Sequence, residues 1–215
     1  MKGIALISGG KDSYLSALIA LINGIEIEKT ITIKAQTDSM MFHFPNAILG
    51  SAVSKLLGLE NIIIEESEFE SSISEYKGYR LIAGAIASEY QKTRLERLCL
   101  ENEIIPYFPL WRRNQEDILR EFMESGSEGI LVSVSAEGLD EKYLGRRIDE
   151  SLLNDLKRLN LRYGISLVGE GGEYESLVTF SPWTGMRLQI MEKEIVDRGM
   201  QKLLIIKSYK LIKEY

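Results

Sequence analysis

The chain has 215 residues, of which 45% are hydrophobic and 27% charged, a composition typical of globular proteins that excludes an intrinsically disordered chain. Its formal net charge of −6 argues against a general nucleic-acid scaffold, because proteins that bind the phosphate backbone carry clustered, excess Lys and Arg. Cys99 and His43 are the only cysteine and histidine, which excludes an intrachain disulfide, a Cys/His zinc site and a two-cysteine redox relay.

Location and metal use follow from the same counts. Polar residues interrupt every hydrophobic segment before it reaches the roughly 18 apolar residues that a membrane-spanning helix needs. Met1 and Lys2 lead directly into an apolar run without a cleavage site, so we expect a cytoplasmic protein without signal peptide or membrane contact. A bound metal would be held by oxygen atoms, which favours Mg²⁺.

The first half of the chain alternates short apolar runs with amphipathic ones. Residues 3–7 suit a strand buried on both faces, and Leu15, Leu18, Ile19 and Ile22 then recur at the spacing of one helix face. Further strands are expected at 27–33, 61–64, 79–83 and 104–105, and helices at 49–56 and 88–101. Strands that alternate with helices predict an α/β fold with a parallel sheet.

The second half has a different texture. A helix around residues 118–123 leads to Glu-Ser-Gly-Ser at 124–127, the most linker-like stretch, so we place a domain boundary after residue 124. Beyond it we expect a helix at 151–161 and strands at 130–134, 165–168, 177–180, 188–195 and 203–212. The pattern predicts a first domain over residues 1–124 and a smaller, partly antiparallel α+β domain over residues 125–215.

The sequence SGGKDS at residues 8–13, here called the N-terminal loop, joins the first strand to the first helix. Its glycines, Gly9 and Gly10, let the backbone turn N–H groups toward an anion, and the following helix adds the positive end of its dipole. Ser8 and Ser13 supply hydroxyls, Lys11 supplies a cation, and Asp12 supplies a carboxylate that can reach a metal ion. The loop predicts a phosphate site of neither the Walker A nor the G-x-G-x-x-G type, with a tight turn and capped helix as the alternative.

Gly84 follows the strand expected at 79–83, where ligands of open parallel sheets bind, and it suits close approach to a nucleotide. Arg94 suits bidentate binding of phosphate. The residues that begin the intervening helix are candidates for the same cleft: Ser88, Glu89, Tyr90 and Gln91. A solvated helix face is the alternative for the charged members.

Residues 169–175, GEGGEYE, here called the acidic loop, fit neither a helix nor a strand. They concentrate negative charge beside glycines that permit close approach, and the members are Glu170, Gly171, Gly172, Glu173, Tyr174 and Glu175 after Gly169. An acidic surface turn is the alternative.

Three other candidates have equally plain structural alternatives. His43 could contact nucleotide or substrate, or serve as a structural hydrogen bonder between two aromatic residues. Arg146 could clamp phosphate, dock a protein substrate or form a surface ion pair. Trp111, with Arg112 and Arg113, suits a docking patch, while burial in the core is the alternative for Trp111.

The N-terminal loop, in its context of strand and helix, resembles the PP-loop of the N-type ATP pyrophosphatases. The resemblance implies a Rossmann-like sheet and cleavage of ATP between its α and β phosphates. A substrate oxygen attacks the α phosphorus and becomes adenylated, and the loop holds the leaving pyrophosphate. Several enzyme classes share this module, so the loop alone does not name a substrate.

Motifs along the chain resemble, in order and spacing, the diphthine–ammonia ligases, which make diphthamide on translation elongation factor 2. They are SGGKDS at 8–13, MFHFPN at 41–46, GAIASEYQKTRLERLC at 84–99, PLWRRNQEDILREF at 109–122, GLDEKYLGRRID at 138–149 and GEGGEYESLVTFSPW at 169–183. The resemblance covers nearly the whole chain through about residue 183. Ser176 stands where the family usually has Thr, a change that keeps the hydroxyl.

The resemblance implies an ATP- and Mg²⁺-dependent, AMP-forming amide ligase in which ammonia displaces AMP from adenylated diphthine. Lys11 would stabilise the leaving pyrophosphate and Asp12 would help organise the metal. Among the glutamates of the acidic loop, with Glu173 first, one would take a proton from ammonium and another would face the trimethylammonium group of diphthine beside Tyr174 or Trp183. The expected partners are elongation factor 2 and ammonium, without stable nucleic-acid binding, and a homodimer stays open.

Cys99 lies on the apolar side of an expected helix, which leaves no candidate for a glutamine-hydrolysing cysteine and favours free ammonia as the nitrogen donor. Two alternatives remain at this point. One is another adenylating enzyme of the same module, acting on a small acid or a tRNA base. The other is a regulator that binds ATP or AMP without turnover.

Overall fold

The computed structural model describes residues 1–34 and 49–214, so the candidate His43 lies outside the described residues. Contacts along the chain divide it into two compact units, Met1–Arg112 and Arg113–Tyr215. In the described parts of both units, no helix has the combined length and apolar composition that crossing a membrane requires.

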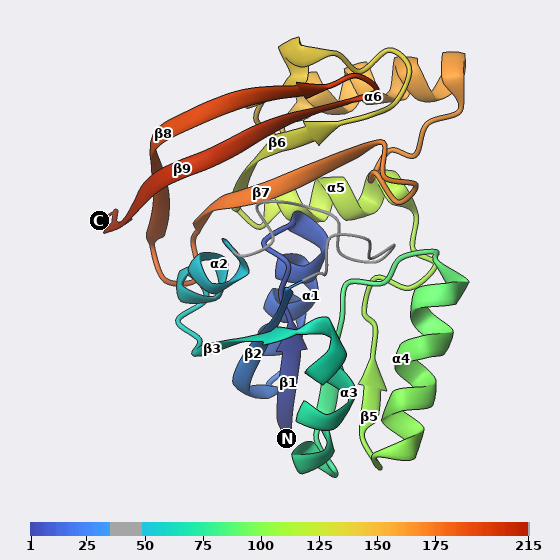
Figure 1. Cartoon of the computed structure of the whole chain (residues 1–215), viewed down its shortest axis with the longest axis vertical. Coiled ribbons are helices and arrows are strands. Elements are labelled where there is room, and N and C mark those ends of the chain that lie inside the picture. Colours follow the sequence, from blue (N-terminus) through green and yellow to red (C-terminus); the bar gives the residue numbers. More distant parts are fainter. Residues whose placement is uncertain (35–48, 215) are drawn as a thin grey trace. The chain divides into compact units, whose positions relative to one another are not determined.

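The first unit is a parallel five-stranded sheet with helices on its faces (Figure 1). The strands, in the spatial order β3-β2-β1-β4-β5, are β1 (Lys2–Leu6), β2 (Glu26–Lys34), β3 (Asn61–Glu65), β4 (Arg80–Ile82) and β5 (Ile105–Tyr107). The helices are α1 (Lys11–Ile22), α2 (Gly50–Leu56), α3 (Phe69–Ser72) and α4 (Glu89–Glu101), with 3₁₀ turns η2 (Glu66–Glu68) and η3 (Ser74–Tyr76). The predicted α/β fold with a Rossmann-like parallel sheet is confirmed.

β1 lies at the centre of this sheet, where the order of the strands changes direction. From β1 the chain moves outward to β2 and β3 and then returns to β4 on the other side of β1. Open parallel sheets bind their ligands at such a switch point, beyond the carboxyl ends of the strands. The N-terminal loop follows β1 and Gly84 comes soon after β4, so both segments lie at that edge.

Burial explains which residues form these elements. Ile4, Ile31 and Leu81 of the strands are buried together with Phe69 of α3 and Leu95 of α4. On α1, Leu15 and Leu18 are buried as the helical spacing predicts. Ile22 was expected on the same face, but it is 66% exposed because it is the last residue of the helix.

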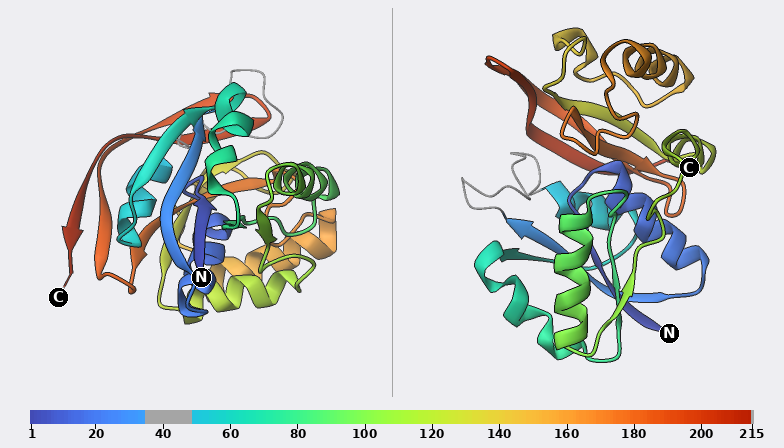
Figure 2. Two further views of the ribbon diagram at one scale, coloured as in Figure 1. Left: turned by 90° about the horizontal axis from the view of Figure 1, so that it is seen from below. Right: turned by 90° about the vertical axis from the view of Figure 1, so that its right-hand side faces the viewer.

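The second unit combines helices with an antiparallel sheet that closes on itself in the order β6-β7-β8-β9. Its elements are α5 (Gln115–Glu124), β6 (Glu128–Val134), η4 (Glu141–Tyr143), α6 (Glu150–Tyr163), β7 (Tyr174–Ser181), β8 (Met186–Arg198) and β9 (Gln201–Lys213). β8 and β9 form a long, curved hairpin (Figure 2). The predicted α+β character of the second region is confirmed.

The hairpin joins the rest of the sheet near its two ends. β7 pairs with β8 at Met186 and Arg187, and β6 pairs with β9 at Lys202 and Leu203. At the first of these junctions, the guanidinium of Arg187 donates a 2.7 Å hydrogen bond to Glu128, which lowers the pKa of that carboxyl. Closure of the sheet is therefore reinforced by an ion pair between β6 and β8.

Two expectations about the second half differ from the structure. Residues 165–168 form coil and a turn instead of a strand, and the N–H of Leu167 donates to a side chain, Oε1 of Gln115, at 2.8 Å. The division between units falls before α5, whereas the sequence placed it after this helix. Within the second unit, Glu116 contacts Lys157 and Arg120 contacts Glu150, so ion pairs link α5 to α6.

Candidate functional site

The backbone of the N-terminal loop has the form of a helix N-terminus that can receive an anion. Gly9 has a φ of +94°, in the left-handed region that favours glycine. Gly10 is extended and forms the N-cap of α1 without a side-chain hydrogen bond to the helix. The first N–H groups of an α-helix lack acceptors within the helix, and their partial positive charge favours a phosphate.

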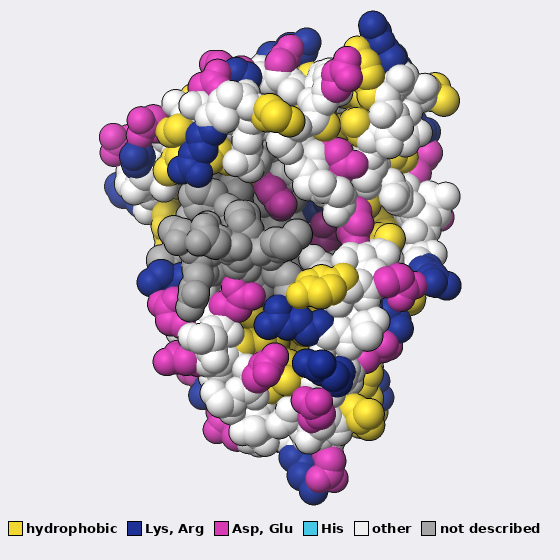
Figure 3. Space-filling view, turned by 45° about the vertical axis from the view of Figure 1, so that its right-hand side comes forward, with side chains coloured by type: hydrophobic (Ala, Val, Ile, Leu, Met, Phe, Trp, Pro, Cys, Tyr) yellow, Lys and Arg dark blue, Asp and Glu magenta, His cyan; other side chains and the backbone are white. Residues whose placement is uncertain are grey.

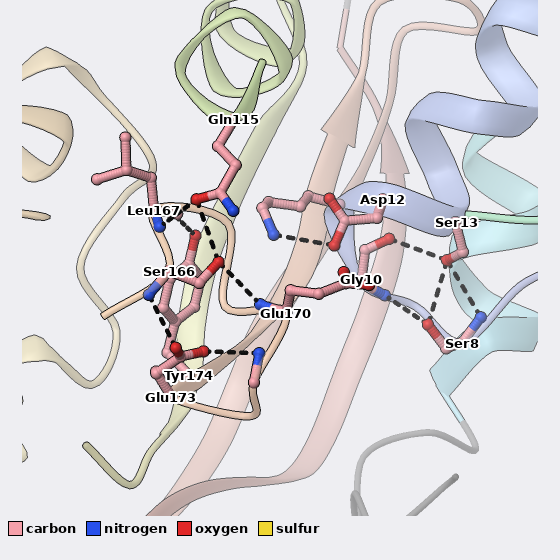
Figure 4. Close-up of polar contacts among 12 residues, drawn as sticks. Ser8, Gly10, Asp12, Ser13, Gln115, Ser166, Leu167, Glu170, Glu173 and Tyr174 are labelled. Atoms are coloured by element: carbon pink, nitrogen blue, oxygen red, sulfur yellow. Dashed lines mark hydrogen bonds and ion pairs between the residues drawn. The ribbon is translucent and has the colours of Figure 1, made fainter. Parts of the chain in front are cut away.

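Serine hydroxyls hold the loop in this shape (Figure 4). Oγ of Ser13 accepts a 3.2 Å hydrogen bond from the N–H of Ser8 and donates one of 3.0 Å to the carbonyl of Gly10. Oγ of Ser8 accepts from the N–H of Gly10 at 3.4 Å and lies 3.2 Å from Oγ of Ser13. The loop is thus preorganised by its own side chains.

Lys11 and Asp12 form an ion pair at the beginning of α1. Nζ of Lys11 lies 3.0 Å from Oδ2 of Asp12, and Lys11 is only 2% exposed. A buried ammonium costs solvation free energy that a paired carboxylate offsets. The pair keeps a positive charge and a carboxylate beside the loop, the two kinds of group predicted to serve a phosphate and its metal ion.

Gly84 packs against the N-terminal loop itself. A Cβ atom added to Gly84 would lie 2.7 Å from the backbone carbon of Asp12 and from the backbone nitrogen of Ser13. Close approach of Gly84 to a nucleotide stays a prediction, and the contact that the structure gives is with the start of α1. Gly84 therefore sets the position of the loop.

The candidates of α4 occupy its first turns and contact neighbouring parts of the first unit. Oγ of Ser88 caps the helix by accepting from the N–H of Gln91, and Glu89 pairs with Arg112. Tyr90 is 67% exposed. Arg94 lies 3.5 Å from Glu66 and 3.8 Å from Glu70, so the structure places its guanidinium beside η2 and α3. Nucleotide binding by these residues stays a prediction.

In the acidic loop, the carboxylate of Glu173 binds backbone N–H groups of the loop and of the residues just before it. Oε1 accepts from the N–H of Ser166 and Oε2 accepts from the N–H of Gly171, both at 2.8 Å (Figure 4). A carboxylate that accepts two backbone hydrogen bonds acts as a local brace. Glu173, the glutamate ranked first by the sequence for proton transfer, is thus engaged in shaping the loop.

Two residues missed by the sequence analysis complete this brace. Oε1 of Gln115 accepts hydrogen bonds from the N–H of Leu167 and, at 3.3 Å, from the hydroxyl of Ser166. The hydroxyl oxygen of Ser166 also accepts from the N–H of Glu170. Ser135 donates from its hydroxyl to the carbonyl of Gly172. Gln115 lies in the PLWRRNQEDILREF motif, but nothing in its local pattern indicates a partner some fifty positions away.

The other members of the acidic loop differ in exposure. Tyr174 is 2% exposed and its hydroxyl donates a 2.7 Å hydrogen bond to the carbonyl of Leu167, which gives it a place in the core. Glu170 is half-buried, and Glu175 is exposed near the start of β7. Gly172 has a φ of +81°, which favours glycine in the turn.

Arg146 and Trp111 are both held by neighbouring side chains. Arg146 pairs with Asp155 of α6 and donates to Oγ of Ser151 at 2.8 Å, and the ion pair lowers the pKa of Asp155. Two cations lie near Trp111, with Nζ of Lys92 5.2 Å and Cζ of Arg112 5.6 Å from its ring centroid. Roles in phosphate binding or docking stay predictions for both.

Burial lowers the reactivity of the single cysteine. Burial raises the pKa of the Cys99 thiol to about 12, so the nucleophilic thiolate is scarce at neutral pH. Within the described residues, no three His, Cys, Asp or Glu side chains gather as a metal site. Charged side chains of both signs are interspersed on the face shown in Figure 3.

Comparison with known proteins identifies the family. The model of the diphthamide synthase N-terminal domain matches residues 1–105, and that of the diphthamide synthase C-terminal domain matches residues 114–212. A solved structure described as a predicted subunit of tRNA methyltransferase from Methanocaldococcus jannaschii has a TM-score of 0.50 at 19% identity, covering 85% of this chain and 98% of that one. That likeness supports the fold alone.

Curated relatives carry the name diphthine–ammonia ligase. The human protein is 34% identical over 68% of this chain and 52% of its own length. The rat protein is 29% identical over 91% of this chain and 85% of its own length. The Schizosaccharomyces pombe protein is 28% identical over the whole chain but only 40% of its own length. The chain thus spans about half, or less, of several relatives. Because the two domain models match nearly all of its residues, this chain belongs to the diphthine–ammonia ligase family.

Proposed function

We propose that this chain catalyses the ATP-dependent amidation of diphthine on elongation factor 2 to diphthamide, with ammonium as the nitrogen donor and AMP and pyrophosphate as products. Membership in the family supports the overall reaction. The observation that carries the proposal is the N-terminal loop, a glycine-shaped helix N-terminus with a buried lysine at the switch point of a parallel sheet.

The loop serves the first half of the reaction. The backbone N–H groups at the start of α1 bind the phosphates of ATP, and Lys11 stabilises the charge that develops on the departing pyrophosphate. The carboxylate of diphthine attacks the α phosphorus, so the bond between the α and β phosphates breaks and an acyl adenylate forms. The chain supplies position and charge in this step, and no protein nucleophile is needed.

The residues present fit a magnesium ion that arrives with the nucleotide. Mg²⁺ in such sites is usually held by one or two carboxylates together with phosphate oxygens and water. Asp12 offers one carboxylate at the loop. Mg²⁺ would neutralise part of the phosphate charge, and Asp12 would orient it.

The acidic loop serves the second half of the reaction. Since Glu173 braces the backbone, we assign the attraction of cations to Glu170 and Glu175, of which Glu175 is the more exposed. One of these carboxylates draws ammonium and takes its proton, and the other faces the trimethylammonium group of diphthine. Ammonia then attacks the acyl carbon, and AMP leaves.

A direct test incubates the chain with ATP, Mg²⁺, ammonium and diphthine-bearing elongation factor 2. The expected products are AMP, pyrophosphate and a modified histidine whose mass matches conversion of the carboxylate to an amide. Omitting ammonium must abolish the mass change. Release of ADP and phosphate would contradict the assignment of the loop, and tight nucleotide binding without products would favour a regulator.

The same proposal includes a cytoplasmic location and elongation factor 2 as the protein substrate. The protein substrate rests on the family resemblance and the location on the sequence-based expectation, and both are tested together by labelling the chain in cells and isolating the modified factor. Because the chain spans about half, or less, of the length of several relatives, the assay also tests whether its two units suffice for the reaction.

A further inference from the structure

The peptide bond between Ile7 and Ser8 is held from both sides. Its carbonyl oxygen, on Ile7, accepts a 2.8 Å hydrogen bond from the hydroxyl of Thr32 in β2. Its N–H, on Ser8, donates a 3.2 Å hydrogen bond to Oγ of Ser13. Because a peptide unit is planar, these two bonds together fix the orientation of the plane at the point where β1 becomes the N-terminal loop.

That orientation extends into the loop through the serine hydroxyls. Oγ of Ser13, which receives the N–H of Ser8, donates in turn to the carbonyl of Gly10. Gly10 is the N-cap of α1. A rotation of the peptide plane between Ile7 and Ser8 would therefore disturb the N–H groups proposed to hold phosphate. A chain of hydrogen bonds thus leads from β2 to the start of α1.

Thr32 is itself fixed and shielded from water. It is fully buried, and its Oγ1 accepts a 3.0 Å hydrogen bond from Nδ2 of Asn61. Gly50 leaves no spare room, since a Cβ atom there would lie 2.4 Å from both the carbonyl oxygen of Ile7 and Oγ1 of Thr32. The carbonyl of Ile7 and the hydroxyl of Thr32 are therefore packed closely against the backbone of Gly50.

We propose that Thr32 is a positioning residue for the nucleotide loop, acting through the peptide bond between Ile7 and Ser8 without touching the nucleotide. The inference rests on the proposed function only in that the N-terminal loop binds ATP. Thr32 lies in the sheet, on a different strand from the one that leads into the loop.

Thr30 provides a matched control on the same strand. It too is fully buried, and its hydroxyl bonds to Ser54 at 2.7 Å, to the carbonyl of Glu60 at 2.9 Å and to Asn61 at 2.9 Å. It shares the network of Thr32 but has a different set of partners, among which Ile7 is missing. Thr30→Val and Thr32→Val each replace a buried hydroxyl of β2 with a methyl group. Thr32→Val removes the hydrogen bond to the carbonyl of Ile7, and Thr30→Val leaves that bond in place.

The experiment measures the dissociation constant for ATP and Mg²⁺ by calorimetric titration, together with urea unfolding. We expect Thr32→Val to raise the dissociation constant for ATP about tenfold, because this change corresponds to the net free energy of about one hydrogen bond. Thr32→Ser keeps the donor and should stay within about threefold of the original chain. Thr30→Val should lose comparable stability yet bind ATP normally.

The inference fails if Thr32→Val binds ATP normally, or if Thr30→Val weakens binding equally. If Thr32→Val does not fold, the test compares Thr32→Cys with Thr32→Ser. A thiol is a weaker hydrogen-bond donor than a hydroxyl, so Thr32→Cys should bind ATP less tightly than Thr32→Ser. Absence of ATP binding by the unaltered chain would overturn the proposed function and the inference together, whereas normal binding in every variant would overturn the inference alone.

Discussion

The N-terminal loop and the acidic loop are both rich in glycine, but their backbone N–H groups serve different purposes. In the N-terminal loop, hydroxyls of Ser8 and Ser13 shape the chain, and α1 begins at an N-cap without a side-chain bond. In the acidic loop, Glu173 accepts from the backbone N–H groups of Gly171 in the loop and of Ser166 just before it. Glycine alone therefore does not make an anion site, because a carboxylate from the same segment can occupy the backbone donors.

The largest effect is expected from removing the buried charge of the N-terminal loop. Lys11→Met should lower the rate of AMP and pyrophosphate formation about 100- to 1,000-fold, because a cation in a site shielded from water stabilises the departing phosphate strongly. Product formation with all substrates present measures this. Lys77→Met, at an exposed lysine of the same unit, is the control, and turnover of Lys11→Met at the control rate would contradict the role.

A second substitution moves the loop without changing its charges. Gly84→Ala would place a methyl group 2.7 Å from the backbone of Asp12 and Ser13, so α1 must shift. Overpacking of this kind costs about 1–3 kcal/mol, and we expect ATP affinity to fall about 10- to 100-fold. Gly24→Ala, where an added Cβ meets nothing within 4 Å, should leave ATP binding unchanged despite some backbone strain. Equal losses in both variants would argue against the contact.

The acidic loop distinguishes a brace from a base. Glu173→Gln keeps one acceptor and loses the other, which should loosen the loop, raise KM for the modified elongation factor about tenfold and leave ATP binding intact. A positioning role leaves the shape of the pH profile unchanged. Loss of the acidic limb of the profile together with a fall in kcat would instead support the proton transfer first predicted for Glu173. Glu137→Gln, at an exposed glutamate of the same unit, is the control.

The smallest effect concerns acid stability of the second unit. The pKa of Glu128 lies below its ordinary value of 4.5 because Arg187 donates a hydrogen bond to the carboxylate. Such a group stabilises the fold fully above about pH 4.5, and this contribution disappears as the pH falls through the lower folded-state pKa. Urea unfolding across this range should show a smaller pH dependence for Arg187→Met, and an unchanged dependence would contradict the assignment. Solvent screening of this pair, whose side chains are 24% and 25% exposed, limits the effect to about 1 kcal/mol.

Much of the first unit could be predicted because its signals are local. The strand, the glycines and the helix around the N-terminal loop follow one another within some twenty residues, and the parallel sheet follows from their alternation. The family resemblance is confirmed by both domain models. In each case the pattern that carries the prediction is contiguous in the sequence.

What could not be predicted depends on partners far apart in the chain. Gln115 holds Leu167, and Thr32 holds Ile7, through bonds that no periodicity announces. Residues 165–168 have the apolar content of a strand, yet Leu167 gives its N–H to the side chain of Gln115 instead of a neighbouring strand. The sequence indicated the acidic loop by composition but could not show that Glu173 turns inward.

The long β8 hairpin strand has a consequence for association between chains. β7 pairs with β8 only at Met186 and Arg187 in the described part of the chain, so most of β8 has a paired strand, β9, on one side only. Met191 and Ile195 are exposed along it, but Glu192, Lys193 and Glu194 separate them. Charges on a strand edge oppose pairing with a second copy, and Glu192, Lys193 and Glu194 place such charges on this strand.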